Sequence, residues 1–347
     1  MDASSRTRKR PDGTGGRCLN DYVVKGSTNN MNLLRLVLRW IVGRFAFTGD
    51  IAQFYNTCKL GARQWNLQRF IWKEDLDRAA PVKEGTITTL MYGVKCVAAQ
   101  SGHALQELAE TVKNEDPALY DFLKYCVYVD DMASSSSDLG ACQELTRRAD
   151  KLFSRVGLEC KGWCFSGEDP PDKVTKDGIS VGVASLVHIP AVDALRVKIP
   201  LLHFSKKRRG RLDDKTNFFQ GAFGDLEEFV PKKLSRRQVT SKVASVFDVL
   251  GKFAPILIGL KLDLREVVLN TETWDEAMSP DLRNKWLSNF WKLELLKGIN
   301  FQRAVMPENA INTDMRLITC VDAALETMMT GCWEVSCKRM VLGLANL

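Results

Sequence analysis

Residues 122–135 read FLKYCVYVDDMASS, which places two adjacent acids, Asp130 and Asp131, in the middle of a largely apolar stretch. The flanking segments predict the two strands of a hairpin, with the acids at its tight turn. Adjacent carboxylates repel each other, and a place between apolar strands costs them hydration. Divalent cations are the usual compensation, so this turn is a candidate metal site.

A third acid, Asp50, follows a short apolar strand predicted at residues 45–47. If this strand lies beside the hairpin, all three carboxylates meet at one edge of a sheet. Such a group suits two Mg²⁺ ions about 3.5–4 Å apart, the arrangement used for in-line phosphoryl transfer. By composition alone, an exposed Asp-Asp turn and an unrelated aspartate explain the same residues equally well.

The composition is that of a globular protein with more than one domain. The 347 residues are 45% hydrophobic and 26% charged, which is ordinary for globular chains and sufficient for two or three domains. No apolar run reaches the ~18–20 residues that span a bilayer. The polar, basic N-terminal segment lacks the apolar core of a secretory signal. We therefore expect an intracellular protein, located in the cytoplasm, a virus-like particle or the nucleus.

The ten cysteines are scattered singly along the chain. The closest pairs, Cys160 with Cys164 and Cys332 with Cys337, have no histidine in zinc-ligand spacing. We expect reduced and mostly buried thiols.

Basic residues cluster in a chain whose net charge is +7. One run is KKRRGR at residues 206–211, and a second group comprises Lys232, Lys233, Arg236 and Arg237. Such clusters suit a polyanionic partner, because each phosphate contact releases condensed counterions. A solvated loop is the alternative for either cluster.

Apolar periodicity and capping residues predict a mixed α/β segment followed by a helical block and a final β-rich segment. Helices are expected over 31–44, 98–113, 139–156, 236 to about 251, from Pro255 onward, and from Pro280 to about 297. The first of these is expected to share one apolar face among Leu33, Leu34, Val37, Leu38 and Ile41. Strand, turn and strand follow after residue 315, and domain boundaries are expected at 166–180 and 300–312.

Seven sequence blocks occur in an order that resembles the polymerase region of BEL/Pao-type LTR retrotransposons. They are GGRCLNDYVVKG, TGDIAQFYN, YGVKC, YVDDMASSSSD, GLECKGWCFSGEDP, LSRRQVTSKVASVFDVLGKFAPI and WDEAM with LRNKW, and they cover nearly the whole chain. The YVDD block resembles the catalytic hairpin of reverse transcriptases. The resemblance implies an α+β fold: a right-hand polymerase palm, a helical thumb or connection, and the first strands of an RNase H-like domain.

In that arrangement each part of the chain has an expected place. Residues 1–30 are a loop that remains from the fingers, and 31–185 form the palm. Residues 186–234 are a basic linker or connector, 235–300 are the helical thumb or connection, and 311–347 are a truncated start of the RNase H-like domain.

The resemblance also implies the metal ligands and the reaction. Asp50 and Asp130 are the expected principal ligands of two Mg²⁺ ions, with Asp131 in support and Mn²⁺ as a possible replacement. The reaction is two-metal nucleotidyl transfer to a primer 3′-hydroxyl. The partners are an RNA or DNA template with its primer and deoxynucleoside triphosphates, without a membrane, and the chain is expected to belong to a larger Gag-Pol-type polyprotein.

Four further positions are implied to contact the nucleotide. Tyr55 is expected under the sugar, where it excludes a 2′-hydroxyl; a core aromatic is the alternative. Tyr92 and Gly93 are expected to pack the templating base pair, although Gly93 also suits a simple turn. Lys161 is expected near the pyrophosphate as a proton donor, with a surface lysine as the alternative.

Four basic residues of the helical block are expected to follow the backbone of the template–primer duplex: Arg236, Arg237, Lys242 and Lys252. Recognition there is expected to use shape and phosphate contacts, because a polymerase has to accept every base sequence.

Three features depart from the family pattern. The chain begins after the expected fingers, and Val97-Ala98 stand where the family has Ser-Pro. Asp322 matches the first metal ligand of an RNase H domain, but one carboxylate cannot hydrolyse a phosphodiester.

An RNA-directed DNA polymerase is the first hypothesis for the function of this chain. The alternative is a catalytically inactive, truncated or domesticated remnant that only binds nucleic acid, while an unrelated RNA-binding protein would make the ordered blocks a coincidence.

Overall fold

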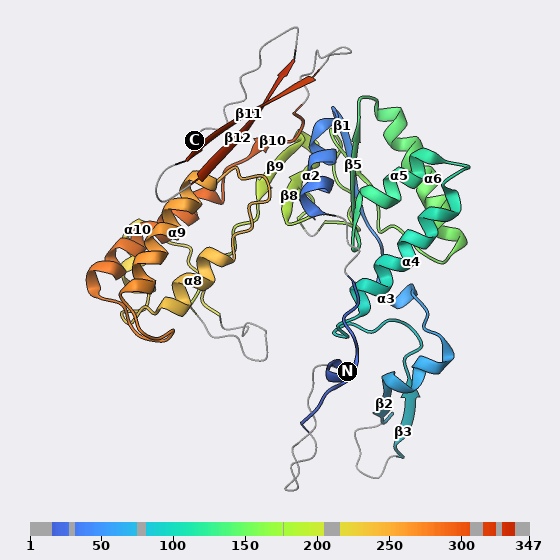
Figure 1. The fold of residues 1–347 in the computed structure, drawn as a ribbon, viewed down its shortest axis with the longest axis horizontal. Helices are drawn as coiled ribbons and strands as arrows, with labels where there is room; N and C mark the ends of the chain where they lie inside the picture. The colour runs from blue at the N-terminus through green and yellow to red at the C-terminus, as the bar shows by residue number, and fades with distance from the viewer. Residues whose placement is uncertain are drawn as a thin grey trace. The chain divides into compact units, whose positions relative to one another are not determined.

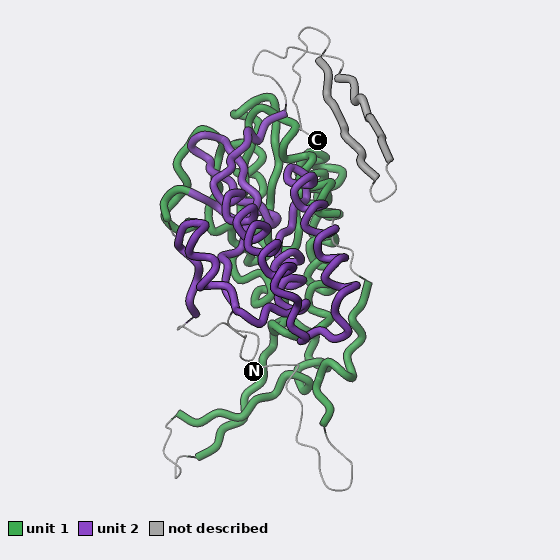
Figure 2. The backbone as a smooth tube through the Cα atoms, turned by 90° about the vertical axis from the view of Figure 1, so that its left-hand side faces the viewer, with its two compact units in different colours: residues 1–179 green, residues 180–347 purple. Residues whose placement is uncertain are grey.

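The computed structural model describes most of the chain as two compact units. The described residues are 16–27, 32–74, 81–175, 177–204 and 216–305, with the backbone of two further strands at 315–323 and 328–336. The units are Met1–Ile179 and Ser180–Leu347, and Figure 2 colours them separately. Their boundary falls inside the segment 166–180 where the sequence predicts one.

The first unit is built on a four-stranded antiparallel sheet of order β4-β5-β1-β6. Figure 1 labels its two central strands, β1 and β5. β1 is Phe45–Asp50, flanked by β5, Asp131–Ser136, and by β6, Cys164–Phe165; β4 is Val127–Tyr128. The four central residues of β1 are all buried, because helices cover both faces of the sheet.

Three helices form the core on one face of this sheet: α4 (Val97–Val112), α5 (Pro117–Tyr125) and α6 (Leu139–Arg155). Their buried side chains surround Phe47 of β1 in one cluster. The other face belongs to α2, Leu33–Val42, which packs on β5. There the Ser135 hydroxyl, on the strand position paired with Ala46, donates to the Arg39 carbonyl at 2.6 Å. Alternation along a strand explains why neighbouring residues reach opposite layers.

The remaining elements of the first unit are short. They are α1 (Leu19–Tyr22), α3 (Phe54–Thr57), the 3-10 helix η1 (Ala62–Gln68), and the paired strands β2 (Arg69–Trp72) and β3 (Lys83–Thr86).

Two predictions for this unit are wrong in detail. Residues 122–125 belong to α5 and not to a strand, since Asp116 caps the helix by accepting from the Leu119 N–H and Pro117 occupies its first turn. These helix-start signals outweigh the β propensity of the following aromatic residues.

The buried face of α2 also differs from the prediction. Leu34 and Leu38 are 45% and 46% exposed, whereas Leu36 and Trp40 are fully buried. Apart from Arg35 and Arg39 every residue of this helix is apolar, so periodicity alone does not select the face that meets β5.

The second unit contains a four-stranded antiparallel sheet of order β10-β9-β8-β7. Its strands are β7 (Val181–Val183), β8 (Leu186–Ile189), β9 (Ala194–Val197) and β10 (Phe301–Gln302). The 3-10 helices η2 (Pro190–Val192) and η3 (Phe223–Asp225) precede and follow β9 in the chain. β11 (Met315–Ala323) and β12 (Met328–Ser336) pair separately as the predicted terminal hairpin.

The helical block comprises α7 (Leu226–Phe229), α8 (Arg236–Ala244), α9 (Ala254–Leu269) and α10 (Pro280–Leu296). The predicted capping box of Ser235 with Gln238 opens α8, and the Ser279 side chain accepts from the Leu282 N–H at the start of α10. α8 ends at Ala244, earlier than the predicted end near 251. No helix within the described ranges is long and apolar enough to cross a membrane.

The seven cysteines whose side chains are described are all free thiols, and four of them are buried: Cys18, Cys126, Cys142 and Cys164. This agrees with the expectation of reduced and mostly buried thiols.

A buried ion cluster ties the last strand of the second sheet to the turn before β9. Arg303, whose side chain is fully buried, donates to both carboxylate oxygens of Asp193 at 2.8 Å. The His188 Nε2 lies 3.1 Å from Asp193 Oδ1. Burial raises the pKa of Asp193, but the hydrogen bonds with His188 and Arg303 outweigh it and hold this pKa below its usual value.

For His188 burial has the opposite sign and lowers the pKa, because it disfavours the charged imidazolium. The hydrogen bond to Asp193 offsets only part of this decrease. Both pKa values are depressed by folding, so the stability they contribute is present at neutral pH. It is lost on acidification, as the pH falls below about 6.5 for His188 and below about 4 for Asp193.

We predict that Asp193→Ala destabilises the protein by about 3–5 kcal/mol, because it leaves the Arg303 guanidinium buried without its counterion. Urea unfolding of both proteins measures the loss. The matched control is Asp275→Ala, which removes the exposed partner of Arg237 and should shift the midpoint far less. Equal losses in the two variants would contradict the role given to the cluster.

Candidate active site

The register of the first sheet brings the three predicted carboxylates to one edge. Asp50, the last residue of β1, is the direct cross-strand partner of Asp131, the first residue of β5. Asp130 lies in the two-residue turn between Tyr128 and Asp131, and its carbonyl accepts from the Ile51 N–H at 2.9 Å. The sequence prediction that the strand of Asp50 neighbours the hairpin is confirmed.

The turn that carries Asp130 is strained. Val129 has a φ of 59°, and a β-branched residue in this left-handed region costs of order 1–3 kcal/mol. Two-residue hairpin turns with a positive φ at this position favour glycine. The ladder on both sides holds Val129 in place, and the strained conformation fixes where Asp130 projects.

Lys161 reaches the site on a segment that continues the ladder past the end of β1. The Ala52 N–H donates to the Glu159 carbonyl at 2.8 Å and the Lys161 N–H to the Asp50 carbonyl at 2.9 Å. The Lys161 ammonium lies 2.6 Å from Asp50 Oδ1. Its pKa is raised by its bond to Asp50 and further by the charges of Asp50 and Asp130. Lys161 therefore lies beside Asp50 with its side chain 45% exposed, and its expected role as a proton donor near the pyrophosphate stays a prediction.

The ionised form of Asp130 is destabilised by its surroundings. Burial raises its pKa, and the neighbouring charge of Asp50 raises it further, while its own backbone N–H and the Lys161 ammonium act in the opposite direction. A group in this situation gains from a nearby cation. Asp50, Asp130 and Lys161 thus form one coupled set of charges.

Two tyrosines form an aromatic wall beside these charges. The ring centroid of Tyr55, on α3, lies 5.1 Å from that of Tyr92 and 6.2 Å from that of Phe54. The pKa of Tyr55 is raised first by burial and then by the charges of Asp130 and Tyr92, which places the phenol within electrostatic reach of Asp130. Tyr55 is half-buried and Tyr92 is 57% exposed, so both rings are available to a ligand. Gly93 has a φ of +87° and forms the turn after Tyr92.

A divalent ion at these carboxylates would need further donors from a substrate or water. Among the residues with described side chains, no three Asp, Glu, His or Cys groups are placed to ligate one ion together. Mg²⁺ is usually held by one or two carboxylates together with substrate phosphates and water, without an all-protein cage. Asp50 and Asp130 supply that donor set, and the Lys161 ammonium stands at Asp50 where a cation would bind.

The sequence analysis missed Trp163, which fixes the segment of Lys161. Its ring lies against the Cα of Gly49, so that a Cβ added there would lie 2.7 Å from the ring. Its indole N–H donates to both oxygens of Asp150 at 3.0 Å. A glycine inside a strand, directly before Asp50, was the available signal for such a close approach.

Two of the four basic candidates in the second unit have local partners. The Arg236 guanidinium lies 4.3 Å from the ring centroid of Trp274. Arg237 makes a two-pronged bond with Asp275 at 2.8 and 2.9 Å. Both side chains hold α8 to the loop that follows α9.

The two lysine candidates lie over aromatic rings of the same unit. The Lys242 ammonium is 5.6 Å from the ring centroid of Phe204, and that of Lys252 is 5.5 Å from Phe301. The basic run at 206–211 and the side chain of Asp322 lie outside the described residues. The duplex contacts expected of the four candidates stay predictions.

Comparison with known proteins gives one family match and two similar structures. Residues 235–338 match the family described as "Pao retrotransposon-like RNaseH-like domain". This segment begins at the N-cap of α8 and includes α9, α10 and the terminal hairpin. It covers residues 235–300, which were expected to form a thumb or connection, and most of 311–347, the expected start of RNase H, under one RNaseH-like description. No curated protein sequence matches the chain.

Both structures are foamy virus protease-reverse transcriptases. One, in complex with RNA/DNA hybrid, is 12% identical with a TM-score of 0.51 over 94% of this chain and 36% of its own. The other, called dRH and in complex with ds DNA, is 11% identical with a TM-score of 0.54 over 94% of this chain and 48% of its own. The present chain thus spans less than half of either, and identities this low establish the fold alone.

That fold is the α+β fold expected from the sequence. The chain is thus similar over residues 235–338, less than half of its length, to a Pao retrotransposon-like RNaseH-like domain, and it is similar in fold to the two foamy virus proteins.

Proposed function

We propose that this chain is an RNA-directed DNA polymerase that adds deoxynucleotides to the 3′-hydroxyl of a primer. The supporting observation is the gathering of two carboxylates, a lysine and two tyrosines at one edge of the first sheet: Asp50, Asp130, Lys161, Tyr55 and Tyr92. Acids, a cation and an aromatic wall are the groups that metal-bound triphosphate, pyrophosphate and a sugar with its base require.

Asp50 and Asp130 are the proposed Mg²⁺ ligands, with Asp131 in support. When bound, Mg²⁺ lowers the pKa of the primer hydroxyl and neutralises charge on the triphosphate. The strained Val129 turn and the cross-strand pairing of Asp50 with Asp131 fix the backbone from which these carboxylates project. The protein therefore supplies most of the positioning before substrate arrives.

Lys161 has two successive roles in this proposal. Without substrate, its ammonium neutralises Asp50 at a distance of 2.6 Å. If a cation and a triphosphate replaced it at Asp50, the ammonium would be free to donate a proton to the leaving pyrophosphate. Before that exchange, its bond to Asp50 raises the pKa of Lys161 and favours the protonated form.

The nucleotide sugar is proposed to lie on Tyr55. Because the ring is held between Phe54 and Tyr92, it is a rigid wall that leaves little room for a 2′-hydroxyl. Tyr92 and Gly93 are proposed to contact the templating base pair beside it.

The polymer partner is proposed to be a template–primer duplex, as the complexes of the two foamy virus proteins suggest by analogy. Arg236, Arg237, Lys242 and Lys252 remain its proposed phosphate contacts. The proposed substrates are deoxynucleoside triphosphates, and the chain is proposed to be part of a larger polyprotein. Asp322 is proposed as the first metal ligand of an RNase H site.

One observation favours the second candidate function, nucleic-acid binding without catalysis. Lys161 already neutralises Asp50, and an ion pair that does not open would keep the metal out. Substitution at Asp130 separates the two functions.

We predict that Asp130→Asn lowers primer extension on poly(rA)/oligo(dT) with Mg²⁺ at least about 100-fold, since a lost metal ligand removes several kcal/mol of transition-state stabilisation. The same change relieves a buried carboxylate with a raised pKa, so the thermal midpoint should stay equal or rise. Asp169→Asn, an exposed acid outside the cluster, is the matched control for activity. Full extension by the Asp130 variant would exclude the proposed site. No extension by any protein, with duplex binding retained, would favour the second candidate.

The pH dependence supplies an independent prediction. Because the pKa of Asp130 is raised, activity should fall on acidification through a pKa above the usual value of about 3.9 for aspartate. Mg²⁺ competes with the proton, so a tenfold higher Mg²⁺ concentration should move this acidic limb to lower pH. Measurement of kcat/KM against pH at two Mg²⁺ concentrations checks this. If the pH at which kcat/KM falls is the same at both Mg²⁺ concentrations, metal binding at Asp130 is contradicted.

Tyr55 is predicted to control sugar selection. Tyr55→Ala opens the wall and should raise the ratio of ribonucleotide to deoxynucleotide incorporation at least about tenfold, which corresponds to about 1.4 kcal/mol of discrimination. Tyr55→Phe keeps the ring and should retain the original ratio. Competition between UTP and dTTP in primer extension measures both, and an unchanged ratio in the alanine variant would place the sugar elsewhere.

A further inference from the structure

A single side chain joins the N-terminal segment of the first unit to the turn that carries Tyr92. The Asn20 amide donates from Nδ2 to the Gly93 carbonyl at 2.8 Å, and its Oδ1 accepts from the Lys95 N–H at 2.9 Å. These partners lie 73 and 75 residues away in sequence. The amide therefore pairs with the turn as a neighbouring strand would, with one donor and one acceptor.

The turn held in this way needs external support. Gly93 has a φ of +87°, and glycine loses more conformational freedom on folding than any other residue. Residues 92–96 form turns and irregular backbone before α4 begins at Val97. Two backbone hydrogen bonds close it locally, from the Val94 N–H to the Met91 carbonyl at 3.4 Å and from the Val97 N–H to the Val94 carbonyl at 3.1 Å. This backbone carries the ring of Tyr92 that faces Tyr55.

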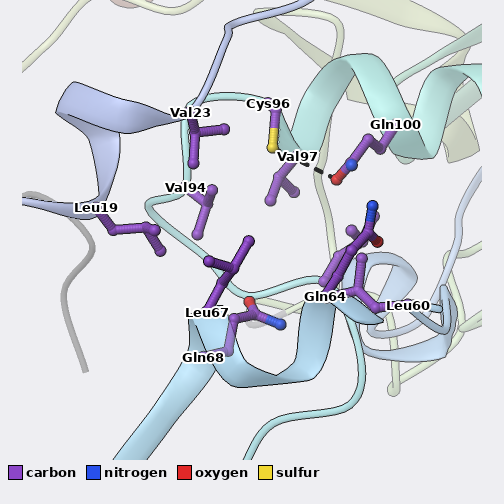
Figure 3. A pocket seen from close by; sticks show the side chains of 11 residues that line it. Leu19, Val23, Leu60, Gln64, Leu67, Gln68, Val94, Cys96, Val97 and Gln100 are labelled. Atoms are coloured by element: carbon purple, nitrogen blue, oxygen red, sulfur yellow. Dashed lines mark hydrogen bonds between the residues drawn. The ribbon is translucent and has the colours of Figure 1, made fainter. Parts of the chain in front are cut away.

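A pocket of about 130 Å³ is lined here by residues of both segments, among them Leu19 and Val23 of the N-terminal segment and Val94 and Val97 (Figure 3). Beside this pocket the two hydrogen bonds of Asn20 link the N-terminal segment directly to the backbone of residues 93–95.

The short helix that carries Asn20 is closed by a local hydrogen bond. This helix is α1, where Asp21 Oδ2 accepts from the Cys18 N–H at 2.9 Å and closes the first turn. Further along, Gly26 approaches α4 so closely that an added Cβ would lie 3.0 Å from the Cβ of Ala99. The N-terminal segment is therefore closed by a local hydrogen bond around Asn20 and lies against α4 at Gly26.

We propose that Asn20 is a positioning residue for the nucleotide pocket, which holds the Tyr92–Gly93 turn so that Tyr92 stays against Tyr55. This inference rests on the proposed polymerase function for its kinetic consequence, while the restraint on the turn is independent of that function. Asn20 touches neither the carboxylates nor the proposed path of the phosphates, so its effect should be on nucleotide binding.

Amide hydrogen exchange and steady-state kinetics on the full chain test the proposal together. In Asn20→Ala the Lys95 amide should exchange about tenfold faster, as expected for loss of one protecting hydrogen bond. The KM for dTTP should rise about tenfold, with kcat changed less than about twofold, because the carboxylate site is untouched. A general loss of folded protein would instead lower kcat and leave KM unchanged.

Two matched variants sharpen the test. Asn20→Asp keeps the acceptor for the Lys95 N–H and removes the donor to Gly93, so Lys95 exchange should stay near the original rate while KM takes an intermediate value. Tyr22→Ala, on the same short helix but 67% exposed, should leave exchange and KM unchanged.

Unchanged Lys95 exchange in Asn20→Ala, or a fall in kcat without a rise in KM, would overturn the proposal. If the original chain does not polymerise at all, the proposed function fails, and the exchange of Lys95 still decides whether Asn20 restrains the turn.

Discussion

The antiparallel pairing of β1 with β5 is the constraint on which the rest of the first unit depends. Its register sets Asp50 directly opposite Asp131 and leaves Asp130 in the two-residue turn beside them. A shift by one residue would turn every side chain of one strand to the other face, which would separate the acids and expose Phe47. The core and the site therefore require the same register, and the burial of apolar side chains from three helices stabilises the alignment of the charges.

The site contains features that oppose folding. Asp130 is a partly buried carboxyl whose pKa is raised by burial and by Asp50, and Val129 occupies a left-handed conformation unsuited to a β-branched residue. Each is unfavourable alone, and neither contributes to the core. Strain and like charge gathered at one turn are characteristic of a site arranged for a ligand, and in this structure the Lys161 ammonium offsets part of the repulsion.

Groups from distant parts of the sequence complete this edge through backbone connections. The segment of Lys161 is held by hydrogen bonds beyond the end of β1 and by Trp163 packed on Gly49. The turn of Tyr92 is held by Asn20. In both cases a side chain outside the charge cluster fixes a short loop, so the precision of the site comes from its supports as much as from the carboxylates.

Local sequence signals determined much of this protein. The Asp-Asp turn and the capping residues Ser235 and Ser279 predicted the hairpin and the helix starts, because turns and caps depend on residues only a few positions apart. The order of the sequence blocks along the chain predicted the α+β fold. The tertiary structure alone decided which face of α2 is buried, that Lys161 pairs with Asp50, and that Asn20 holds a turn 73 residues away. Those choices depend on which distant segments become neighbours, and a one-dimensional pattern of polar and apolar residues does not contain that information.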